Sequence, residues 1–318
     1  MQASLDTQRE GTMQIVSVNI SGEKGTVKRS VPETVIDALG LAGDAHAGDW
    51  MRQVSLLGTE AVGRLSAEIL RPIGPGAFGE NLTVAGLDAA SVGILDRFRT
   101  GTVELEVTQI GKECHGDGCA IFRESGRCVM PVEGIFCRVL AGGLVKPGDA
   151  LEHAPHLLRA RVITLSDRAY AGVYEDRSGP RLATLLTEFL ASRRFHESVE
   201  RILLPDDPIS LRVALEAART ERLDLVFTTG GTGIGPRDHA PEVVAAVCSR
   251  LIPGIMESIR ARHGVEHPAA LLSRAVAGVA GTTLVFTLPG SVRAVEEYAD
   301  EIFRVLEHAI LMVRGMGH

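Results

Sequence analysis

The sequence lacks the features of an exported or membrane-spanning protein. Residues 1–12 are polar, without an apolar core of signal-peptide length. No stretch reaches the roughly 18 apolar residues that a membrane span requires. The five cysteines are an odd number in a chain without an export signal, which favours reduced thiols over a disulfide framework. We therefore expect a cytoplasmic protein that does not bind membranes.

The sequence also lacks an excess of positive charge. It has 33 Lys and Arg against 40 Asp and Glu, a net charge of −7 and a pI of about 5.8. Binding to duplex nucleic acid requires a clustered basic face, so we expect no nucleic-acid partner. Its 318 residues are enough for two domains of ordinary size, each with its own core.

The residue pattern changes once along the chain. Residues 13–152 contain short extended segments interrupted by glycine, such as the strand expected at 13–20 and the alternating segment 103–107. This pattern predicts a mainly β, barrel-like first domain. Residues 153–159 are predicted to be a linker. Residues 160–318 then alternate strands with helices, which predicts a layered α/β domain.

One glycine-rich loop, Thr228 to Asp238, dominates the second domain. It follows an apolar strand at 223–227 and precedes a helix that begins at Pro241 and is expected to end near Pro253. Four glycines in six positions allow tight turns and aim backbone N–H groups at an anion. The loop is neither a P-loop, because Gly-Lys-Ser/Thr is absent, nor a Gly-x-Gly-x-x-Gly dinucleotide loop. Asp238 beside such an anion site indicates a bridging cation such as Mg²⁺.

Further short segments accompany the glycine loop, some after predicted strands and one, Asp176 to Pro180, at the start of a predicted helix. They are Ser166-Asp167-Arg168, Asp176 to Pro180, Pro205-Asp206, Leu272-Ser273-Arg274 and Leu288-Pro289-Gly290. In α/β sheets, ligands bind where strands end and loops converge. Ser178, with Pro180 just inside the helix, is suited to capping.

The order and spacing of these segments resemble the Mog-type molybdopterin adenylyltransferases, which include the gephyrin and plant G domains. The resemblance covers nearly all of 160–315 and implies a three-layer α/β fold. It implies Mg²⁺-dependent adenylylation of molybdopterin by ATP, with the family's two functional aspartates at Asp206 and Asp238, although Asp207 leaves that register open by one residue. The other implied binding residues are Ser166, Asp167, Ser178, Gly179, Gly230, Gly231, Thr232, Gly233, Ser273, Pro289 and Gly290.

The chemistry of the first domain centres on its cysteines. Their spacing lacks the paired Cys-x-x-Cys of a zinc site. Cys137, between apolar residues, reads as a small buried hydrophobe. Cys114 and Cys119 instead lie in a glycine-containing loop near Lys112, where positive charge could stabilise a thiolate.

The first domain resembles a MOSC domain, the module of molybdenum-cofactor sulfurases. The segments that resemble it include Gly43 to His46, Arg52 to Leu56, Gly79 to Leu82 and Gly111 to Cys114. The resemblance implies handling of molybdopterin, its sulfur or molybdenum, with Cys114 as the first candidate sulfur carrier and Cys119 as the second.

Two other functions remain open at this stage. The chain could bind or carry the finished cofactor without catalysis, or the MOSC half could transfer sulfur. The resemblance of residues 160–315 to the Mog-type proteins also implies a homo-oligomer, a trimer or larger, that works with other proteins of molybdenum-cofactor synthesis.

Overall fold

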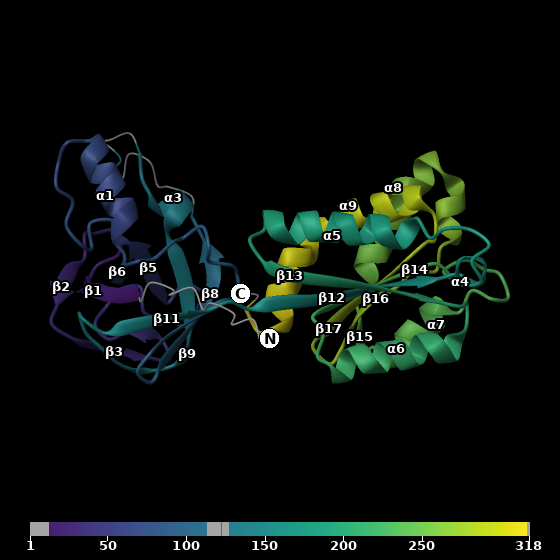
Figure 1. Ribbon diagram of the computed structural model, residues 1–318, viewed down its shortest axis with the longest axis horizontal. Coiled ribbons are helices and arrows are strands. Elements are labelled where there is room, and N and C mark those ends of the chain that lie inside the picture. Colours follow the sequence, from purple (N-terminus) through teal and green to yellow (C-terminus); the bar gives the residue numbers. More distant parts are fainter. Residues whose placement is uncertain (1–12, 113–121, 123–126, 317–318) are drawn as a thin grey trace, which may run out of the picture. The chain divides into compact units, whose positions relative to one another are not determined.

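The computed structural model describes residues 13–112, 122 and 127–316. It divides into two compact units, one extending to His156 and the other beginning at Leu157. Each unit has its own sheet and its own buried core (Figure 1). Of the helices in the described part of the chain, none combines the length and apolar character needed to cross a membrane.

The first unit is a closed barrel made mainly of strands. Its principal sheet has the order β11-β7-β8-β9-β5-β6-β1-β2, and an additional pairing of β11 with β1 closes it. Closure removes exposed sheet edges. The strands of the unit are β1 (Met13–Ile20), β2 (Arg29–Val31), β3 (Thr34–Asp37), β4 (Gly40–Leu41), β5 (Val54–Gly58), β6 (Leu82–Ala85), β7 (Arg97–Thr100), β8 (Val103–Ile110), β9 (Ile135–Ala141), β10 (Gly143–Val145) and β11 (Ala150–Ala154).

Two described helices accompany the barrel, α1 (Thr59–Glu68) and α3 (Met130–Glu133). Leu65 of α1 and Met130 of α3 are buried in one apolar cluster with Leu57 of β5. The expected strands at 13–20 and 103–107 are confirmed as β1 and β8. The prediction of a β-rich, barrel-like first domain is therefore correct.

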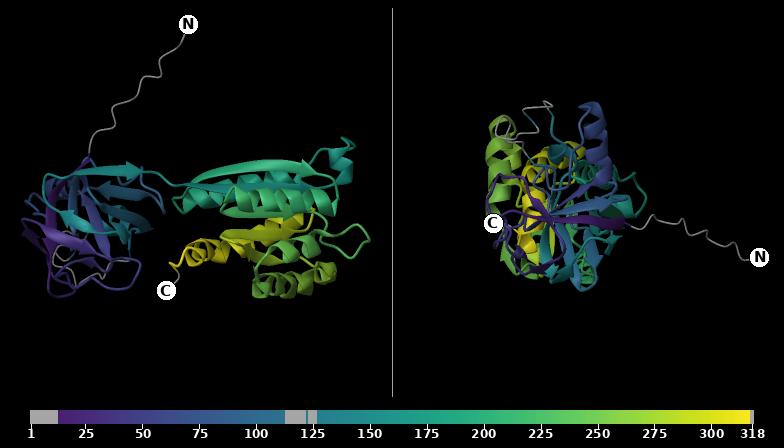
Figure 2. Two further views of the ribbon diagram at one scale, coloured as in Figure 1. Left: turned by 90° about the horizontal axis from the view of Figure 1, so that it is seen from below. Right: turned by 90° about the vertical axis from the view of Figure 1, so that its left-hand side faces the viewer.

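The second unit is built on one mixed sheet with the order β13-β12-β14-β17-β16-β15. The first four strands in that order are parallel, and β16 and β15 are antiparallel additions. Figure 2 shows the two long strands β12 and β13 side by side. The strands are β12 (Leu157–Leu165), β13 (His196–Leu204), β14 (Leu225–Thr229), β15 (Arg250–Leu251), β16 (Ala277–Ala280) and β17 (Thr283–Leu288).

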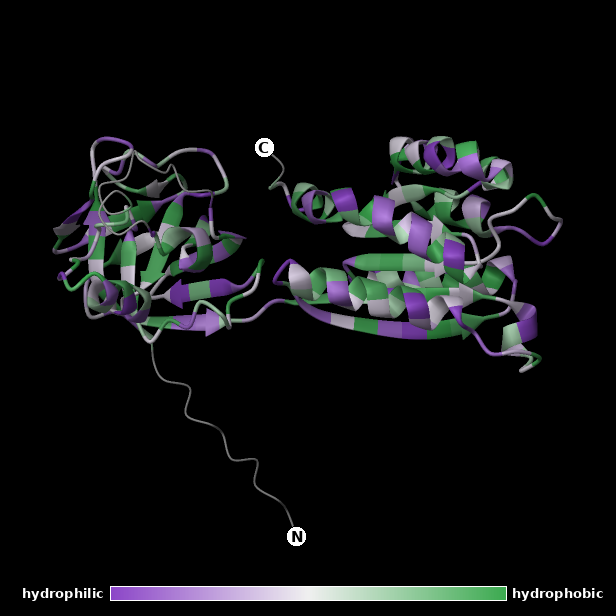
Figure 3. Ribbon diagram, turned by 90° about the horizontal axis from the view of Figure 1, so that it is seen from above, coloured by the Kyte–Doolittle hydropathy of each residue, from purple (hydrophilic) through white to green (hydrophobic). Residues whose placement is uncertain are grey.

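Helices lie on both sides of this sheet: α5 and α9 on one side, and α6 and α7 on the other (Figure 1). On the α5 and α9 side, Phe189 stacks on Phe303 with ring centroids 4.5 Å apart. On the other side, Leu211 and Val244 join the apolar cluster around Val226 of β14. Figure 3 shows the matching pattern, with strands mainly hydrophobic and helices of mixed character. The helices are α4 (Asp167–Tyr170), α5 (Ser178–Ser192), α6 (Pro208–Thr220), α7 (Ala240–Val247), α8 (Pro253–Glu266), α9 (Val292–Val313) and the 3₁₀ helix η2 (Pro268–Leu272).

Two boundaries differ from the sequence-based expectation. The helix around Pro241 ends at Val247, because the next residue, Cys248, has an extended backbone. Pro253 then begins α8 instead of ending α7, in agreement with the preference of proline for a first helical turn. Between the units, β11 continues to Ala154 and β12 already begins at Leu157.

Candidate functional site

The predicted site segments meet at one edge of the second sheet. Strands β13, β12, β14 and β17 are parallel neighbours, so their carboxyl ends share this edge. Asp206 follows β13, Ser166 follows β12 and the glycine loop follows β14. Pro289 and Gly290 follow β17. This is the position at which α/β sheets bind ligands.

Glycine is required where these loops pack against one another. Gly230 has a φ of +105°, and a Cβ at this position would overlap the carbonyl oxygen of Leu165. Its N–H donates to the carbonyl of Leu288 at 3.0 Å. A Cβ on Gly290 would lie 3.3 Å from the Cα of Gly230. The ends of β12, β14 and β17 are therefore held in backbone contact.

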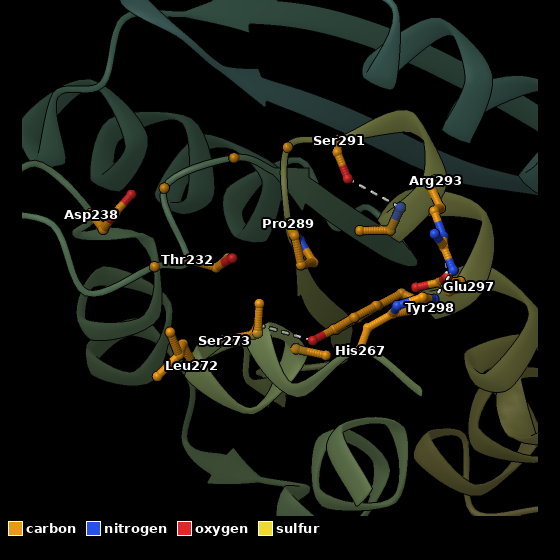
Figure 4. A pocket seen from close by; sticks show the side chains of 17 residues that line it. Thr232, Asp238, His267, Leu272, Ser273, Pro289, Ser291, Arg293, Glu297 and Tyr298 are labelled. Carbon is orange, nitrogen blue, oxygen red and sulfur yellow. Dashed lines mark hydrogen bonds and ion pairs between the residues drawn. The ribbon is translucent and has the colours of Figure 1, made fainter. Parts of the chain in front are cut away.

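A pocket of about 430 Å³ opens beside the glycine loop (Figure 4). This volume is in the range of small-molecule sites. Residues that the sequence predicted form a large part of its lining: Gly230, Gly231, Thr232, Gly233, Asp238, Ser273, Pro289 and Gly290. The sequence reasoning missed His267, Arg293, Glu297 and Tyr298, which complete the opposite wall.

Tyr298 extends from α9 toward Ser273 (Figure 4). Its hydroxyl donates to the Ser273 Oγ at 2.9 Å. Burial raises the pKa of the Tyr298 hydroxyl, so it acts at this wall as a neutral donor. Amphipathic spacing in the last helix predicted burial of Tyr298 but gave no sign that its hydroxyl would reach the pocket.

Two of the remaining predicted residues lie at a second pocket of about 310 Å³. Ser166 and Ser178 line it together with Asp176 and Tyr174, and Gly290 borders both pockets. Asp206 lines neither of these two pockets and instead borders a third, much smaller one with Gly231 and Arg237.

Asp176, rather than Ser178, accepts the hydrogen bonds at the start of α5. Its Oδ1 accepts from the N–H of Gly179 at 3.0 Å and from the hydroxyl of Ser178 at 3.2 Å. Its Oδ2 accepts from the Thr164 hydroxyl at 2.7 Å. The expectation that Ser178 caps this helix is therefore wrong, because α5 begins at Ser178 itself. Gly179 lies beneath this carboxylate, where a Cβ would meet Asp176 Oδ2 at 2.5 Å.

The two adjacent aspartates after β13 have different surroundings. Asp207 caps α6, because its Oδ2 accepts from both the N–H and the hydroxyl of Ser210, each at 2.7 Å. These bonds lower the pKa of Asp207. Asp206 instead accepts from the N–H of Asp167 and borders a small pocket together with Gly231 and Arg237.

Asp206 and Asp238 form a pair of carboxylates with an unfavourable mutual interaction. The pKa of Asp206 is raised, first by burial and then by the charge of Asp238. Asp238 Oδ2 accepts from the N–H of Gly235 at 2.8 Å, so its carboxylate folds over the glycine loop. A cation between the two carboxylates would relieve their repulsion.

The donor set fits Mg²⁺ only together with a phosphate-bearing ligand. Among the residues that the structure describes, no group of three or more His, Cys, Asp and Glu side chains is placed to hold a metal ion. Mg²⁺ is commonly held by one or two carboxylates plus substrate phosphates. Asp206 and Asp238 meet that requirement beside a loop that can bind phosphate.

Asp167 and Arg237 add opposite charges next to this pair. The Arg237 guanidinium forms an ion pair with Asp167. Its side chain remains 66% exposed, so it can turn toward a ligand at little cost in packing.

The motif residues of the barrel are mainly buried in its interior. Lys28 and Asp44 form an ion pair at 2.8 Å, with both side chains 1% exposed. Glu80 is fully buried, and its carboxylate accepts from the N–H groups of Gly76 and Phe78. Burial raises the pKa of Glu80. These residues hold loops of the barrel in place.

The cysteines can be assessed only in part. Cys114 and Cys119 lie outside the described residues. Cys137 is fully buried in β9, which confirms its expected role as a small hydrophobe, and burial raises the pKa of its thiol.

Comparisons with known proteins agree with both halves of this architecture. Two family models match: a MOSC domain over residues 43–152 and a probable molybdopterin binding domain over residues 161–308. The fold and site therefore define a MOSC domain joined to a molybdopterin-binding domain.

Individual relatives make the assignment more specific. A molybdopterin adenylyltransferase of Helicobacter pylori is 34% identical over 158 residues, which are 48% of this chain and 86% of the relative. One from Pyrococcus furiosus is 37% identical over 167 residues, 50% of this chain and 95% of the relative. Through its second unit, the chain belongs to the molybdopterin adenylyltransferase family.

A molybdenum cofactor biosynthesis bifunctional protein of Chlorobaculum tepidum is 33% identical over 174 residues. The match covers 54% of this chain and 54% of that relative. The chain thus spans about half the length of this bifunctional relative.

Proposed function

We propose that the second unit transfers the adenylyl group of ATP to molybdopterin. The observation that carries the proposal is the placement of Asp206 and Asp238 in the loops that follow the neighbouring strands β13 and β14, with Asp238 in a pocket lined by glycine backbone. In this reaction an oxygen of the terminal phosphate of molybdopterin attacks the α-phosphorus of ATP. The bond between the α-phosphorus and the bridging oxygen breaks, and pyrophosphate leaves.

Each residue contributes binding or orientation. The N–H groups of Gly231 to Gly233 would donate to phosphate oxygens, as backbone nests do. Asp206 and Asp238 would hold Mg²⁺, which supplies charge neutralisation to the phosphates when bound. Arg237 would turn from Asp167 toward the charge that develops during transfer.

The two pockets offer separate places for the two substrates. The pocket beside Tyr298 and the pocket beside Tyr174 share Gly290. A pair of ligands that meet at Gly290 would bring their phosphates to the start of the glycine loop, because Gly290 packs against Gly230. Positioning of this kind can supply much of the rate enhancement.

The wider assignment is part of the same proposal. It comprises an N-terminal MOSC domain and a C-terminal three-layer α/β domain, divided in sequence between His156 and Leu157 where the sequence predicted a linker at 153–159, in a cytoplasmic homo-oligomer. The MOSC half would bind molybdopterin or molybdenum, or carry sulfur on Cys114 or Cys119, and other proteins of molybdenum-cofactor synthesis would be its partners.

The direct test is incubation of the purified chain with MgATP and molybdopterin. Pyrophosphate release in step with adenylylated molybdopterin, identified by mass, is the expected result. Binding of molybdopterin without pyrophosphate would instead identify a carrier and overturn the proposal.

A further inference from the structure

Arg274 joins a separate chain segment to the glycine loop. It follows η2 and Ser273 and lies more than thirty residues beyond the loop in sequence. Its backbone N–H donates to the carbonyl of Thr232 at 2.9 Å. Its guanidinium Nε donates to the carbonyl of Gly233 at 2.7 Å, and Nη2 donates to the carbonyl of Asp238 at 2.5 Å.

These contacts bridge the second half of the loop. Gly233 lies at the middle of the loop and Asp238 at its end, so one planar guanidinium spans the turn between them. Within the turn, Asp238 Oδ2 accepts from the N–H of Gly235, and the Asp238 N–H donates to the carbonyl of Gly235 at 3.1 Å. Because glycine loses more conformational freedom on ordering than other residues do, such a turn depends on contacts from outside.

The segment that bears Arg274 is itself fixed. Ser273 accepts from Tyr298 at the wall of the larger pocket. Arg260 of α8 donates to the carbonyls of Ser273 and Ala275, at 3.4 and 3.1 Å. The backbone on both sides of Arg274 is therefore held by hydrogen bonds, and Arg274 connects the pocket wall at Ser273 with the glycine loop.

We propose that Arg274 is a positioning residue that sets the direction of the Asp238 carboxylate and of the loop N–H groups. It donates to backbone carbonyls on the loop, so its own role is orientation of groups that meet the ligand. The effect on catalysis rests on the proposed function, whereas the effect on loop order stands by itself.

Arg274→Lys is the informative variant. Lysine keeps the positive charge but lacks the planar fork of donors, so it cannot hold Gly233 and Asp238 together. A misplacement of about 1 Å can cost about a hundredfold in rate. We expect kcat to fall by up to about a hundredfold, with the KM for molybdopterin within about threefold of wild type.

Hydrogen exchange of the backbone amides supplies a readout that does not need substrate. In Arg274→Lys, the amides of Gly235 and Asp238, which are hydrogen-bonded within the turn, should exchange at least about tenfold faster, because local opening costs less free energy. Amides of β14 and β17 should be unchanged. Arg274→Gln, which has fewer donors, should show the same local loss and gives a second test should the lysine variant fold poorly.

Glu242→Gln is the matched control. Arg274 also forms an ion pair with Glu242, whose side chain is 58% exposed. Exposed ion pairs contribute little to the stability of a fold. Loop exchange and kcat should therefore stay within about twofold of wild type in this variant.

A double variant tests whether Arg274 acts through Asp238. If it does, Asp238→Asn combined with Arg274→Lys should be little slower than Asp238→Asn alone, because coupled residues are not additive. If the double variant instead shows the product of the two single losses in kcat, Arg274 does not act through Asp238. Unchanged hydrogen exchange in the loop of both Arg274 variants would overturn the positioning role of Arg274, whether or not the wild-type chain releases pyrophosphate. Absence of pyrophosphate release by the wild-type chain would refute the proposed function alone.

Discussion

Asp206 and Asp167 hold one another through a reciprocal pair of hydrogen bonds. The N–H of Asp167 donates to Asp206 Oδ2 at 3.0 Å, and the N–H of Asp206 donates to Asp167 Oδ1 at 2.9 Å. The pair ties the end of β12 to the end of β13.

The neighbouring aspartates provide a paired prediction. Asp206→Asn should lower adenylyl transfer by about a hundredfold, because it removes a charge from the proposed metal site. Asp207→Ala should retain turnover but lower the stability of the fold, since it deletes a helix cap. Turnover and chemical unfolding of both variants check this assignment, and the reverse pattern would make Asp207 the functional carboxylate.

Asp206 also predicts a pH dependence of stability. Its folded pKa is raised above the ordinary value of 3.8 by burial and by Asp238. As pH rises, the Asp206 carboxyl therefore loses its proton in the unfolded chain before it does so in the folded chain. The stability that protonated Asp206 contributes to the fold is fully present below about pH 3.8 and is lost as pH rises through the folded pKa.

Asp206→Asn removes the ionisable carboxyl and with it this pH-dependent loss of stability. In metal-free buffer its melting temperature, relative to wild type, should rise between pH 4 and pH 7. Melting curves across this range provide the measurement. A difference that is constant with pH would show that Asp206 carries no such penalty.

Gly230 predicts a large effect on folding. Gly230→Ala places a side chain at a φ of +105° and against the Leu165 carbonyl oxygen, so it should cost about 2 kcal/mol or more. Gly254, near the start of α8, has open space around it. Gly254→Ala should be neutral or slightly stabilising, and equal losses in urea unfolding would contradict the argument.

The units should also function separately. A fragment that begins at Leu157 keeps the whole of β12, whose pairing with β13 starts at that residue. We expect it to fold and to adenylylate molybdopterin. A fragment that is insoluble or inactive, while the full chain is active, would show that the second unit depends on the first.

Much of the second unit was predictable because its signals are local. The apolar run before Thr228, the glycines and Pro241 predicted a strand, loop and helix in the right order, although the strand runs over Leu225–Thr229 instead of 223–227, and β17 matches the expected segment 283–288. Helix α8 was missed because Pro253-Gly254 resembles a helix end, although proline is equally suited to a helix start.

The sequence predicted only those site residues that lie in recognisable local motifs at the ends of strands. Asp206 and Asp238 could be named, but Asp206 could be separated from Asp207 only by seeing which carboxylate bonds Ser210. Tyr298 and Arg274 reach the site from distant elements. Contacts of this kind depend on tertiary packing and leave no local pattern.

The central claim is that Asp238 holds the metal that the transfer requires, and pyrophosphate release by Asp238→Asn tests it most directly. The substitution keeps the shape of the side chain, so the protein should remain folded. Turnover with MgATP and molybdopterin should fall by at least about a hundredfold, with molybdopterin binding better preserved. Turnover close to wild type in a well-folded Asp238→Asn protein would contradict this role of Asp238.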